Sequence, residues 1–276
     1  MKPIVVRGGG DLATGTILRL CKAGFPVIVL ESGCPAAIRR EAAFSEAVRC
    51  GSKTVEDVTC RLAPDAESAL KSVNAAGPQM LVDEKARAVS LIRPEILVDA
   101  ILAKKNLGTH MDMAPLTIAL GPGFNAGKDV HFVIETMRGH DLGRIIKNGS
   151  ALPNTGVPGM ICGYGKERVV HAPASGILHL YHDIGDLVEK DEPLAFLETS
   201  GDKILVPSPL RGVLRGILPD GFSVPSGMKM ADVDPRAEER KNCFTVSDKA
   251  RCIAGSVLEL VCAFQNGMRS TAAEGK

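Results

Sequence analysis

The stretch that decides the fold reads Pro3-Ile4-Val5-Val6-Arg7-Gly8-Gly9-Gly10-Asp11-Leu12-Ala13-Thr14-Gly15. A short apolar run ends in three glycines, and apolar residues at helical spacing follow as far as Gly24. A second apolar run, Pro26–Glu31, comes next. This order predicts a strand, a glycine turn, a helix and a second strand parallel to the first.

The glycine turn fits the spacing G-x-G-x-x-[GA], and Glu31 ends the second strand. In a dinucleotide-binding unit such glycines let a pyrophosphate approach the helix N-terminus, and the acidic residue accepts a hydrogen bond from a ribose hydroxyl. The pattern favours a nucleotide-shaped ligand, although Asp11 would repel its phosphate unless Asp11 caps the helix or meets a cation. The alternative is that the glycines only pack the helix against the strand. The cofactor-binding residues predicted here are Gly8, Gly9, Gly10, Asp11, Ala13 and Glu31.

Further apolar runs alternate with helical patterns along the first 165 residues. We expect helices over Pro35–Cys50 and Ala66–Ala76, and strands over Pro78–Val82, Ala114–Leu120 and Val130–Thr136. Strands separated by helices are typical of right-handed crossovers in a parallel sheet. Residues 1–165 are therefore predicted to form a Rossmann-like α/β domain with a largely parallel sheet.

Two glycine-rich segments follow the strands in the middle of the chain. Glycine loops at strand ends expose backbone N–H groups that bind anions, and arginine side chains bind phosphate or carboxylate through two hydrogen bonds. The alternative is that the arginines pair with Glu135 and Asp141 on a solvated face. The binding residues predicted here are Gly121, Gly123, Arg138, His140 and Arg144. Histidine exchanges protons near neutral pH. His140 and Cys34, the latter in a loop beside the glycine turn, are the candidates for catalysis.

The last hundred residues contain an internal repeat. Gly176 and Gly212 are 36 residues apart, and Val188 and Val224 repeat the same offset. Residues 166–236 are therefore predicted to form a β module of two related halves, which resembles the barrel-sandwich hybrid of biotinyl and lipoyl domains. Met228-Lys229-Met230 resembles the modified motif of biotin carriers. It lies after the second half and not on the central hairpin, so we interpret the module as a rigid binding or docking unit.

A helical segment is predicted over residues 237–267, followed by a frayed tail over 268–276. Within the segment, Ser247–Phe264 carries an apolar stripe at helical spacing. The sequence therefore predicts a C-terminal amphipathic helix after the β module.

Composition excludes several classes of protein. The chain has 276 residues with 33 Lys+Arg, 32 Asp+Glu and 4% aromatic residues, a balance that argues against a nucleic-acid-binding surface. Its apolar runs fall far short of the ~20 residues of a membrane helix, so we expect a cytoplasmic protein with no membrane partner. The eight cysteines show no C-x-x-C pair and no zinc-like spacing. They are expected to be free, mostly buried thiols, and no metal site is predicted.

Taken together, five segments resemble one family. They are Arg7–Gly15, Leu120–Phe124, Val133–His140, Pro153–Gly156 and Asp232–Arg236. They resemble the YqeB-type accessory proteins of selenium-dependent molybdenum hydroxylase systems, which are distant relatives of XdhC/CoxF maturation factors. The resemblance covers about residues 2–265, and the chain departs from the family's G-x-K-[IV] form at Gly227–Met230.

The resemblance implies that the chain binds a molybdopterin-type cofactor, whose dinucleotide form would place its nucleotide end on the glycine turn. It also implies that the chain assists modification of this cofactor or its delivery to a molybdenum hydroxylase client. Two other functions stay open. The first is an NAD(P)-dependent oxidoreductase that uses His140 as proton donor, and the second is a post-translationally modified carrier.

Overall fold

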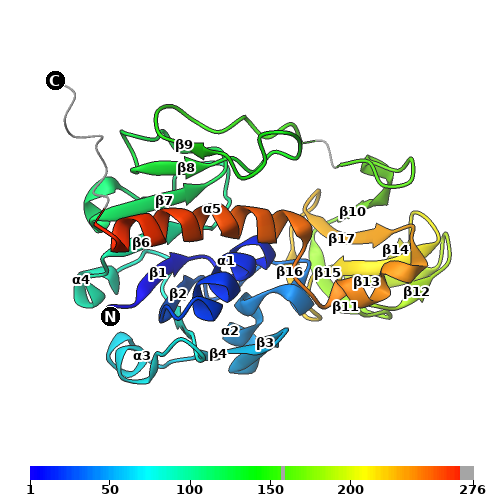
Figure 1. Cartoon of the computed structure of the whole chain (residues 1–276). Helices are drawn as coiled ribbons and strands as arrows, with labels where there is room; N and C mark the ends of the chain where they lie inside the picture. Colours follow the sequence, from blue (N-terminus) through cyan, green and yellow to red (C-terminus); the bar gives the residue numbers. More distant parts are fainter. Residues whose placement is uncertain (157–158, 268–276) are drawn as a thin grey trace. The chain divides into compact units, whose positions relative to one another are not determined.

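The computed structural model describes residues 1–156 and 159–267. The chain forms two compact units (Figure 1). Of the described residues, the first unit comprises 1–35, 43–155 and 246–267, and the second comprises 36–42, 156 and 159–245. Each unit is therefore built from segments that are far apart in the sequence.

A nine-stranded mixed sheet forms the centre of the first unit, with the order β3-β4-β5-β2-β1-β6-β7-β8-β9. The strands from β4 to β8 in this order pair in parallel, whereas β3 and β9 pair antiparallel to their neighbours at the two ends. The strands are β1 (Ile4–Arg7), β2 (Val27–Glu31), β3 (Ser52–Val55), β4 (Val58–Leu62), β5 (Gln79–Val82), β6 (Ile96–Asp99), β7 (Leu116–Leu120), β8 (Phe132–Ile134) and β9 (Ile145–Ile146).

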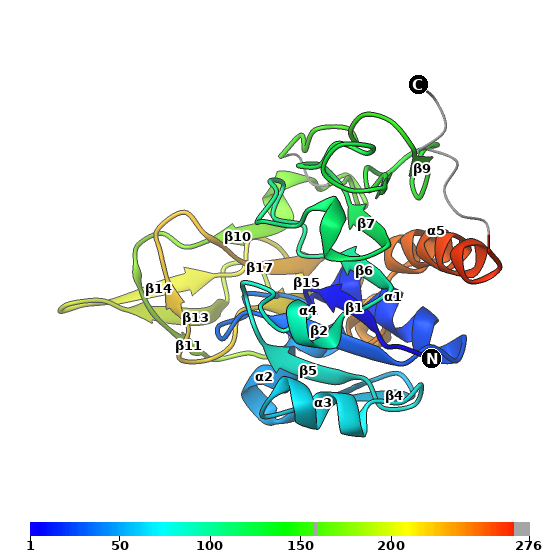
Figure 2. The ribbon, with the colours of Figure 1, turned by 90° about the vertical axis from the view of Figure 1, so that its left-hand side faces the viewer.

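The helices of the first unit cover both faces of this sheet. They are α1 (Asp11–Lys22), α2 (Ala47–Cys50), α3 (Ala66–Ser72), α4 (Val89–Ile92) and α5 (Asp248–Gln265). Side chains alternate along each strand, so Val6 joins one core with α1 and α5, and Val5 joins the opposite core with α3 and α4. In Figure 2, α1 and α5 lie on one side of β1 and α4 lies on the other.

The helices α1 and α5 lie side by side, although more than 200 residues separate them in the chain. A Cβ atom on Gly15 would come within 2.7 Å of the Ala250 Cβ atom, so only glycine permits this approach. The predicted helix Ser247–Phe264 is confirmed. Ser247 is its N-cap, and the Ser247 side chain accepts a hydrogen bond from the Ala250 N–H group.

The second unit contains two antiparallel four-stranded sheets, in the orders β10-β17-β15-β12 and β14-β13-β11-β16. The strands are β10 (Val169–His171), β11 (Gly176–Leu180), β12 (Leu187–Val188), β13 (Pro193–Glu198), β14 (Lys203–Pro207), β15 (Gly212–Ile217), β16 (Ser223–Val224) and β17 (Lys229–Asp234). The internal repeat is visible as an exchange of strands. The strand β12 of the first half pairs with β15 of the second, and β16 of the second half pairs with β11 of the first.

The predicted fold class, a Rossmann-like domain followed by a barrel-sandwich hybrid, is wrong. The large sheet is mixed, and the second unit consists of two small antiparallel sheets. In the described chain, β6, β7 and β8 follow one another without an intervening α-helix, and α5 packs against β7 and β8. The physical reason is local composition. Glycine and proline interrupt both connections, at Gly108, Pro115 and Pro122 among others, and they disfavour a helix.

The predicted helix Pro35–Cys50 is also wrong, because only Ala47–Cys50 is α-helical. Residues 36–42 belong to the second unit instead. There the Arg39 guanidinium donates hydrogen bonds to the carbonyl oxygens of Asn242 and Thr245, and Arg40 donates one to the carbonyl oxygen of Ile217. These tertiary contacts override the helical pattern.

Other predictions have mixed outcomes. The predicted domain boundaries after residues 165 and 236 differ from the limits of the two units. All eight cysteines are free, but only Cys21, Cys60 and Cys243 are buried, so the expectation of mostly buried thiols is wrong. Among the described helices, none combines the length and apolar character that crossing a membrane requires. The predicted tail over 268–276 lies outside the described residues.

Candidate functional site

The glycine turn, residues 8–10, follows the central strand β1. A Cβ atom on Gly8, whose φ is +97°, would lie 2.9 Å from the carbonyl oxygen of Ala100. A Cβ atom on Gly9 would lie 3.0 Å from Met80 Cε and 3.1 Å from the Ser45 nitrogen. Gly10 differs, because its φ is −63° and its Cβ would meet no described atom within 4 Å. Packing therefore explains glycine at positions 8 and 9, whereas at position 10 the space stays open.

This open position is the N-cap of α1. Gly10 provides no capping side chain, and its carbonyl oxygen accepts a hydrogen bond from the Thr14 N–H group at 2.8 Å. A helix N-terminus carries a partial positive charge and backbone donors that favour an anion. Ala13 is fully buried inside the helix, so its side chain packs in the core instead of facing a ligand.

Glu31 does not lie open to a ribose hydroxyl. Its Oε2 atom accepts a hydrogen bond from the Gly9 N–H group at 2.7 Å, and its Oε1 atom accepts one from the Ser32 N–H group at 2.7 Å. The carboxylate thus holds the glycine turn in place. The spacing of Glu31 after the turn predicts a side chain near it, but the structure gives that side chain a structural role.

Charged residues from three distant segments gather near the N-termini of α1 and α5. Burial lowers the pKa of Lys249, and the charge of Arg138 lowers it further, whereas Asp11, Glu135 and Asp248 raise it. Asp11 and Lys249 therefore interact electrostatically across the N-termini of the two helices. Sequence reasoning missed Lys249, because nothing in the helical pattern of α5 distinguishes it from a surface lysine.

The predicted arginine loop lies on the surface of the first unit. Arg138 donates two hydrogen bonds to the Asp248 carboxylate, at 2.8 and 2.9 Å, and they lower the pKa of Asp248. Arg144 donates one to Asp141 at 2.6 Å. His140 is exposed, and among the described residues its imidazole has no hydrogen-bond partner. The expected pairing with Asp141 is therefore found for Arg144, while Arg138 pairs with Asp248.

Glu135, the other expected arginine partner, is buried after β8. Its carboxylate accepts hydrogen bonds from the backbone N–H groups of Thr136, Met137 and Leu152, at 2.7, 2.7 and 2.8 Å. Glu135 therefore ties the segment around residue 152 to the end of β8.

The remaining predicted site residues lie after the same ends of the parallel strands. A Cβ atom on Gly121, after β7, would lie 2.7 Å from Thr136 Oγ1, and one on Gly123 would lie 2.6 Å from the Lys105 nitrogen. Both glycines are thus required by packing, and neither is reserved for a ligand. Cys34 is an exposed free thiol in the loop after β2.

A buried polar cluster at the ends of β1 and β6 was not singled out by the sequence. An Arg7 guanidinium nitrogen donates a hydrogen bond to Thr109 Oγ1 at 2.5 Å, and the Thr109 hydroxyl donates one to Asp99 Oδ2 at 2.5 Å. Burial raises the pKa of Asp99, while Thr109 and Arg7 act in the opposite direction. In the sequence, Arg7 stands at the end of an apolar run that predicts a buried strand. A charged residue at that position was the only sequence signal for this cluster.

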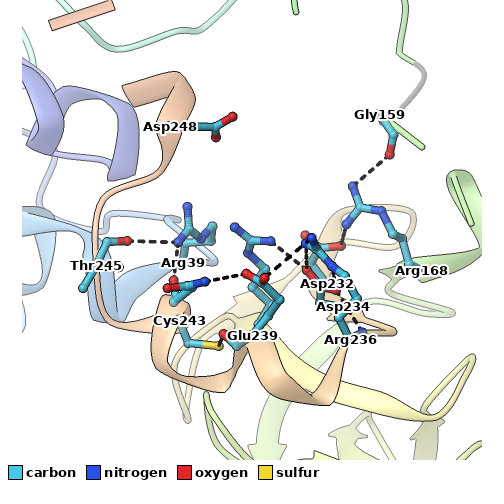
Figure 3. Close-up of polar contacts among 12 residues, drawn as sticks. Arg39, Gly159, Arg168, Asp232, Asp234, Arg236, Glu239, Cys243, Thr245 and Asp248 are labelled. Carbon is cyan, nitrogen blue, oxygen red and sulfur yellow. Dashed lines mark hydrogen bonds and ion pairs between the residues drawn. The ribbon is translucent and has the colours of Figure 1, made fainter. Parts of the chain in front are cut away.

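The second unit has its own arginine–aspartate cluster, which includes the Asp232–Arg236 motif (Figure 3). Arg168 donates a hydrogen bond to Asp232 at 2.5 Å, and Arg215 and Arg236 donate to Asp234 at 2.7 and 2.8 Å. Burial alone would raise the pKa of Asp234, but the hydrogen bonds from the arginines outweigh it and lower the pKa. This motif therefore holds β17 within the second unit. Lys229 opens β17 and is exposed.

The fold and the residues at the carboxyl ends of its strands define an α/β protein with a glycine turn after its central strand. No protein-family model matches the chain. The chain is similar to the uncharacterized protein YqeB of Escherichia coli (strain K12), with 48% identity over 269 residues. That match covers 97% of the chain and 49% of the relative, so the chain spans about half the length of this curated relative.

Comparison with solved structures gives only remote likenesses. An aspartoacylase family protein from Mesorhizobium loti has a TM-score of 0.28 at 13% identity, covering 84% of this chain and 85% of that one. A succinylglutamate desuccinylase/aspartoacylase from Rhodobacter sphaeroides has a TM-score of 0.29 at 11% identity, covering 84% and 85%. Among the described residues, no group of histidine, cysteine, aspartate and glutamate side chains is arranged to hold a metal ion.

Proposed function

We propose that this chain is an accessory factor that binds a molybdopterin-type cofactor, in a pterin dinucleotide form, and assists its modification or its insertion into a molybdenum hydroxylase. The family resemblance of the sequence motifs supports the cofactor class. The observation that carries the proposal structurally is the open space at Gly10, because the packing of the protein itself does not require glycine there.

The residues present fit the anionic end of such a cofactor. The N-terminus of α1 offers backbone donors, and Lys249 interacts electrostatically with Asp11 in the same region. The predicted hydrogen bond from a ribose hydroxyl to Glu31 does not fit the structure, because both carboxylate oxygens of Glu31 already accept hydrogen bonds from backbone N–H groups. In this proposal Glu31 fixes the glycine turn, and the cofactor phosphate lies against Gly10.

Substitution of Gly10 tests this placement. Gly10→Val should abolish cofactor binding, because a branched Cβ would occupy the space where a phosphate approaches. The fold should persist, since the φ of −63° suits any residue and no described atom lies within 4 Å of the new Cβ. The measurement is oxidation of the purified protein with iodine in acid, followed by a search for a fluorescent pterin.

Gly201→Val is the matched control. Gly201 also has an open Cβ position and no left-handed backbone, but it lies in the hairpin between β13 and β14. Wild type and G201V should release the same amount of pterin, and G10V should release none. Equal amounts of pterin from all three proteins would show that the cofactor binds elsewhere. If the wild type released no pterin, the proposal of a molybdopterin-type cofactor would be wrong.

The two other functions predict different results in the same preparation. An oxidoreductase would bind NADH saturably and transfer hydride, although His140 is exposed and has no described partner that would tune it as a proton donor. A modified carrier would gain mass at Lys229 when a biotin or lipoyl ligase is coexpressed. Intact-mass spectrometry should show no such adduct, because Lys229 opens a strand and does not lie on the hairpin between the two halves.

A further inference from the structure

A cavity of about 1030 Å³ lies in the first unit at the amino ends of the parallel strands, whereas the glycine turn lies at their carboxyl ends. Its lining includes Lys2, Glu95, Pro115 and His131, which come just before β1, β6, β7 and β8. The volume slightly exceeds the ~300–1000 Å³ that is usual for small-molecule sites. None of the site residues predicted from the sequence lines this cavity.

Three basic side chains at this cavity have no acidic partner. Lys2, Arg87 and Arg93 line it, and within residues 1–156 and 159–267 none of the three forms an ion pair. Arg93 donates only a long hydrogen bond, of 3.4 Å, from its Nε atom to the Ser90 carbonyl oxygen. All three side chains are exposed, so their charged groups stand free at the mouth of the cavity. Unpaired guanidinium groups at a cavity are suited to a carboxylate or a phosphate.

His131 lines the same cavity and has a defined neutral tautomer. Its Nδ1 atom accepts a hydrogen bond from the Thr117 N–H group at 3.1 Å and lies 2.8 Å from Thr117 Oγ1. Because Nδ1 accepts, the neutral ring carries its proton on Nε2. Burial lowers the pKa of His131, and the nearby charge of Asp112 opposes this effect. The neutral ring with an Nε2–H donor is therefore the form present at neutral pH.

The backbone at this cavity is held in an uncommon conformation. Ala86 and Arg93, at the two ends of the α4 segment, have φ values of +53° and +46°. Such left-handed conformations are unfavourable for a residue with a Cβ atom, and they cluster at functional sites. The helix α4 ends at Ile92, and Arg93 is its C-cap residue, so the helix end sets the position of the Arg93 backbone at the cavity.

From these features we infer that the cavity is a second binding site, for a small organic anion with a carboxylate or phosphate group on an apolar body. Arg87, Arg93 and Lys2 receive the anionic group, and the His131 Nε2–H donates to an acceptor on the ligand. Met111, Met113 and Pro94 supply apolar lining. This site is independent of the proposed cofactor site, because it involves neither the glycine turn nor α5.

Titration with model anions tests the inference. Phenyl phosphate and benzoate are the probes, and benzyl alcohol, which has the same ring without a charge, is the neutral comparison. Binding is followed by calorimetry and by the imidazole signals of His131 in long-range ¹H–¹⁵N spectra. We expect saturable binding of at least one anion and a shift of the His131 signals, with His179 unchanged. The tighter of the two anions identifies the anionic group that the site prefers.

The substitution Arg93→Gly separates binding from folding. Glycine adopts a φ of +46° without strain, so R93G should be at least as stable as the wild type while its affinity falls at least tenfold. Arg87→Gln should also lower the affinity at least tenfold. Arg61→Gln, an exposed charge on β4 away from the cavity, is the control and should leave binding unchanged.

Three results would overturn the inference. They are no saturable binding of either anion at millimolar concentration, equal binding of benzyl alcohol, and anion affinity that is unchanged in both R93G and R87Q. Gly10→Val should leave binding of these probes intact, so failure here is distinguishable from failure of the proposed cofactor site.

Discussion

Asp99 in the first unit and Asp234 in the second unit make an instructive pair, because each is a buried aspartate that ends a strand beside arginine. Their exposed fractions are 1% and 0%. Arg215 and Arg236 hydrogen-bond directly to Asp234, at 2.7 and 2.8 Å. The Arg7 guanidinium lies 3.7 Å from the Asp99 carboxylate, and the Thr109 hydroxyl links the two by hydrogen bonds.

This difference in contact reverses the direction of the pKa shift. Burial raises the pKa of Asp99, and the opposing interactions with Thr109 and Arg7 do not cancel it. Burial also acts on Asp234, but its direct hydrogen bonds from arginine bring the net pKa below the ordinary value. In these two clusters, hydrogen bonds from arginine directly to the carboxylate outweigh burial at Asp234, whereas the Thr109-bridged arginine does not outweigh it at Asp99.

The largest effect is expected from Asp234→Ala. Removing this carboxylate leaves Arg215 and Arg236 without their shared partner, and breaking a buried ion pair typically costs about 3–5 kcal/mol of unfolding free energy. Urea unfolding with hydrogen exchange resolved to the second unit measures the loss. Asp202→Ala, at an exposed aspartate in the hairpin between β13 and β14, is the control. A loss no larger than that of D202A would contradict the role assigned to Asp234.

The lowered pKa of Asp234 also fixes the sign of its pH dependence. Its stabilisation is fully present above the unfolded aspartate pKa, near 3.9, and is lost as the pH falls through the lower folded pKa. D234A should lack this acid-dependent loss.

A smaller effect is expected from Asp99→Asn, about 1–2 kcal/mol, because the charged form of Asp99 is already disfavoured and an amide oxygen still accepts a hydrogen bond. The raised pKa gives the opposite pH dependence. The contribution of Asp99 is present below the unfolded pKa and is lost as the pH rises through the folded pKa. Titration of the Asp99 and Asp234 ¹³Cγ signals by NMR measures both shifts. Should Asp99 titrate below Asp234, the contrast between the two clusters would fail.

The smallest change in stability is expected from Arg138→Ala. The Arg138 and Asp248 side chains are 54% and 66% exposed, and a surface ion pair contributes only ~0–1 kcal/mol. Cofactor affinity should fall by ~1.5–3 kcal/mol if this guanidinium contacts the anion. Thermal unfolding of R138A with and without cofactor separates the two quantities, and Arg144→Ala makes the same test at the other arginine. A large loss of stability with full affinity would remove Arg138 from the site.

The parts of the fold that could be predicted from sequence are those that local patterns determine. The strand, turn and helix around the glycine turn follow from spacing alone, as does the start of α5 at Ser247. The repeat of 36 residues could not show that the second unit contains two separate four-stranded sheets. Each sheet contains strands from both halves of the repeat, and this exchange depends on pairing that the sequence pattern does not reveal. Residues 36–42 could not be placed either, since their partners are carbonyl oxygens about 180–200 residues away.

The candidate site shows the same division. Spacing brings Glu31 beside the glycine turn, but no pattern reveals that backbone N–H groups already occupy both of its oxygens. Lys249 acts on this region only because α5 packs against α1, a contact between the two ends of the described chain. The Thr109 bridge depends on a loop conformation that no residue pattern in that segment predicts.

The close contact of Gly15 with Ala250 also has a consequence for synthesis on the ribosome. A growing chain emerges from its N-terminus at ~5–20 residues per second, so the partner of α1 is made many seconds after α1 itself. Until then, the apolar stripe of α1 lacks its neighbour and the first unit cannot complete its core. The second unit, whose segment Gly156–Thr245 is nearly continuous, is fully made before α5 appears. Nascent chains stalled before Ser247 should therefore hold an ordered second unit and depend on chaperones for the first.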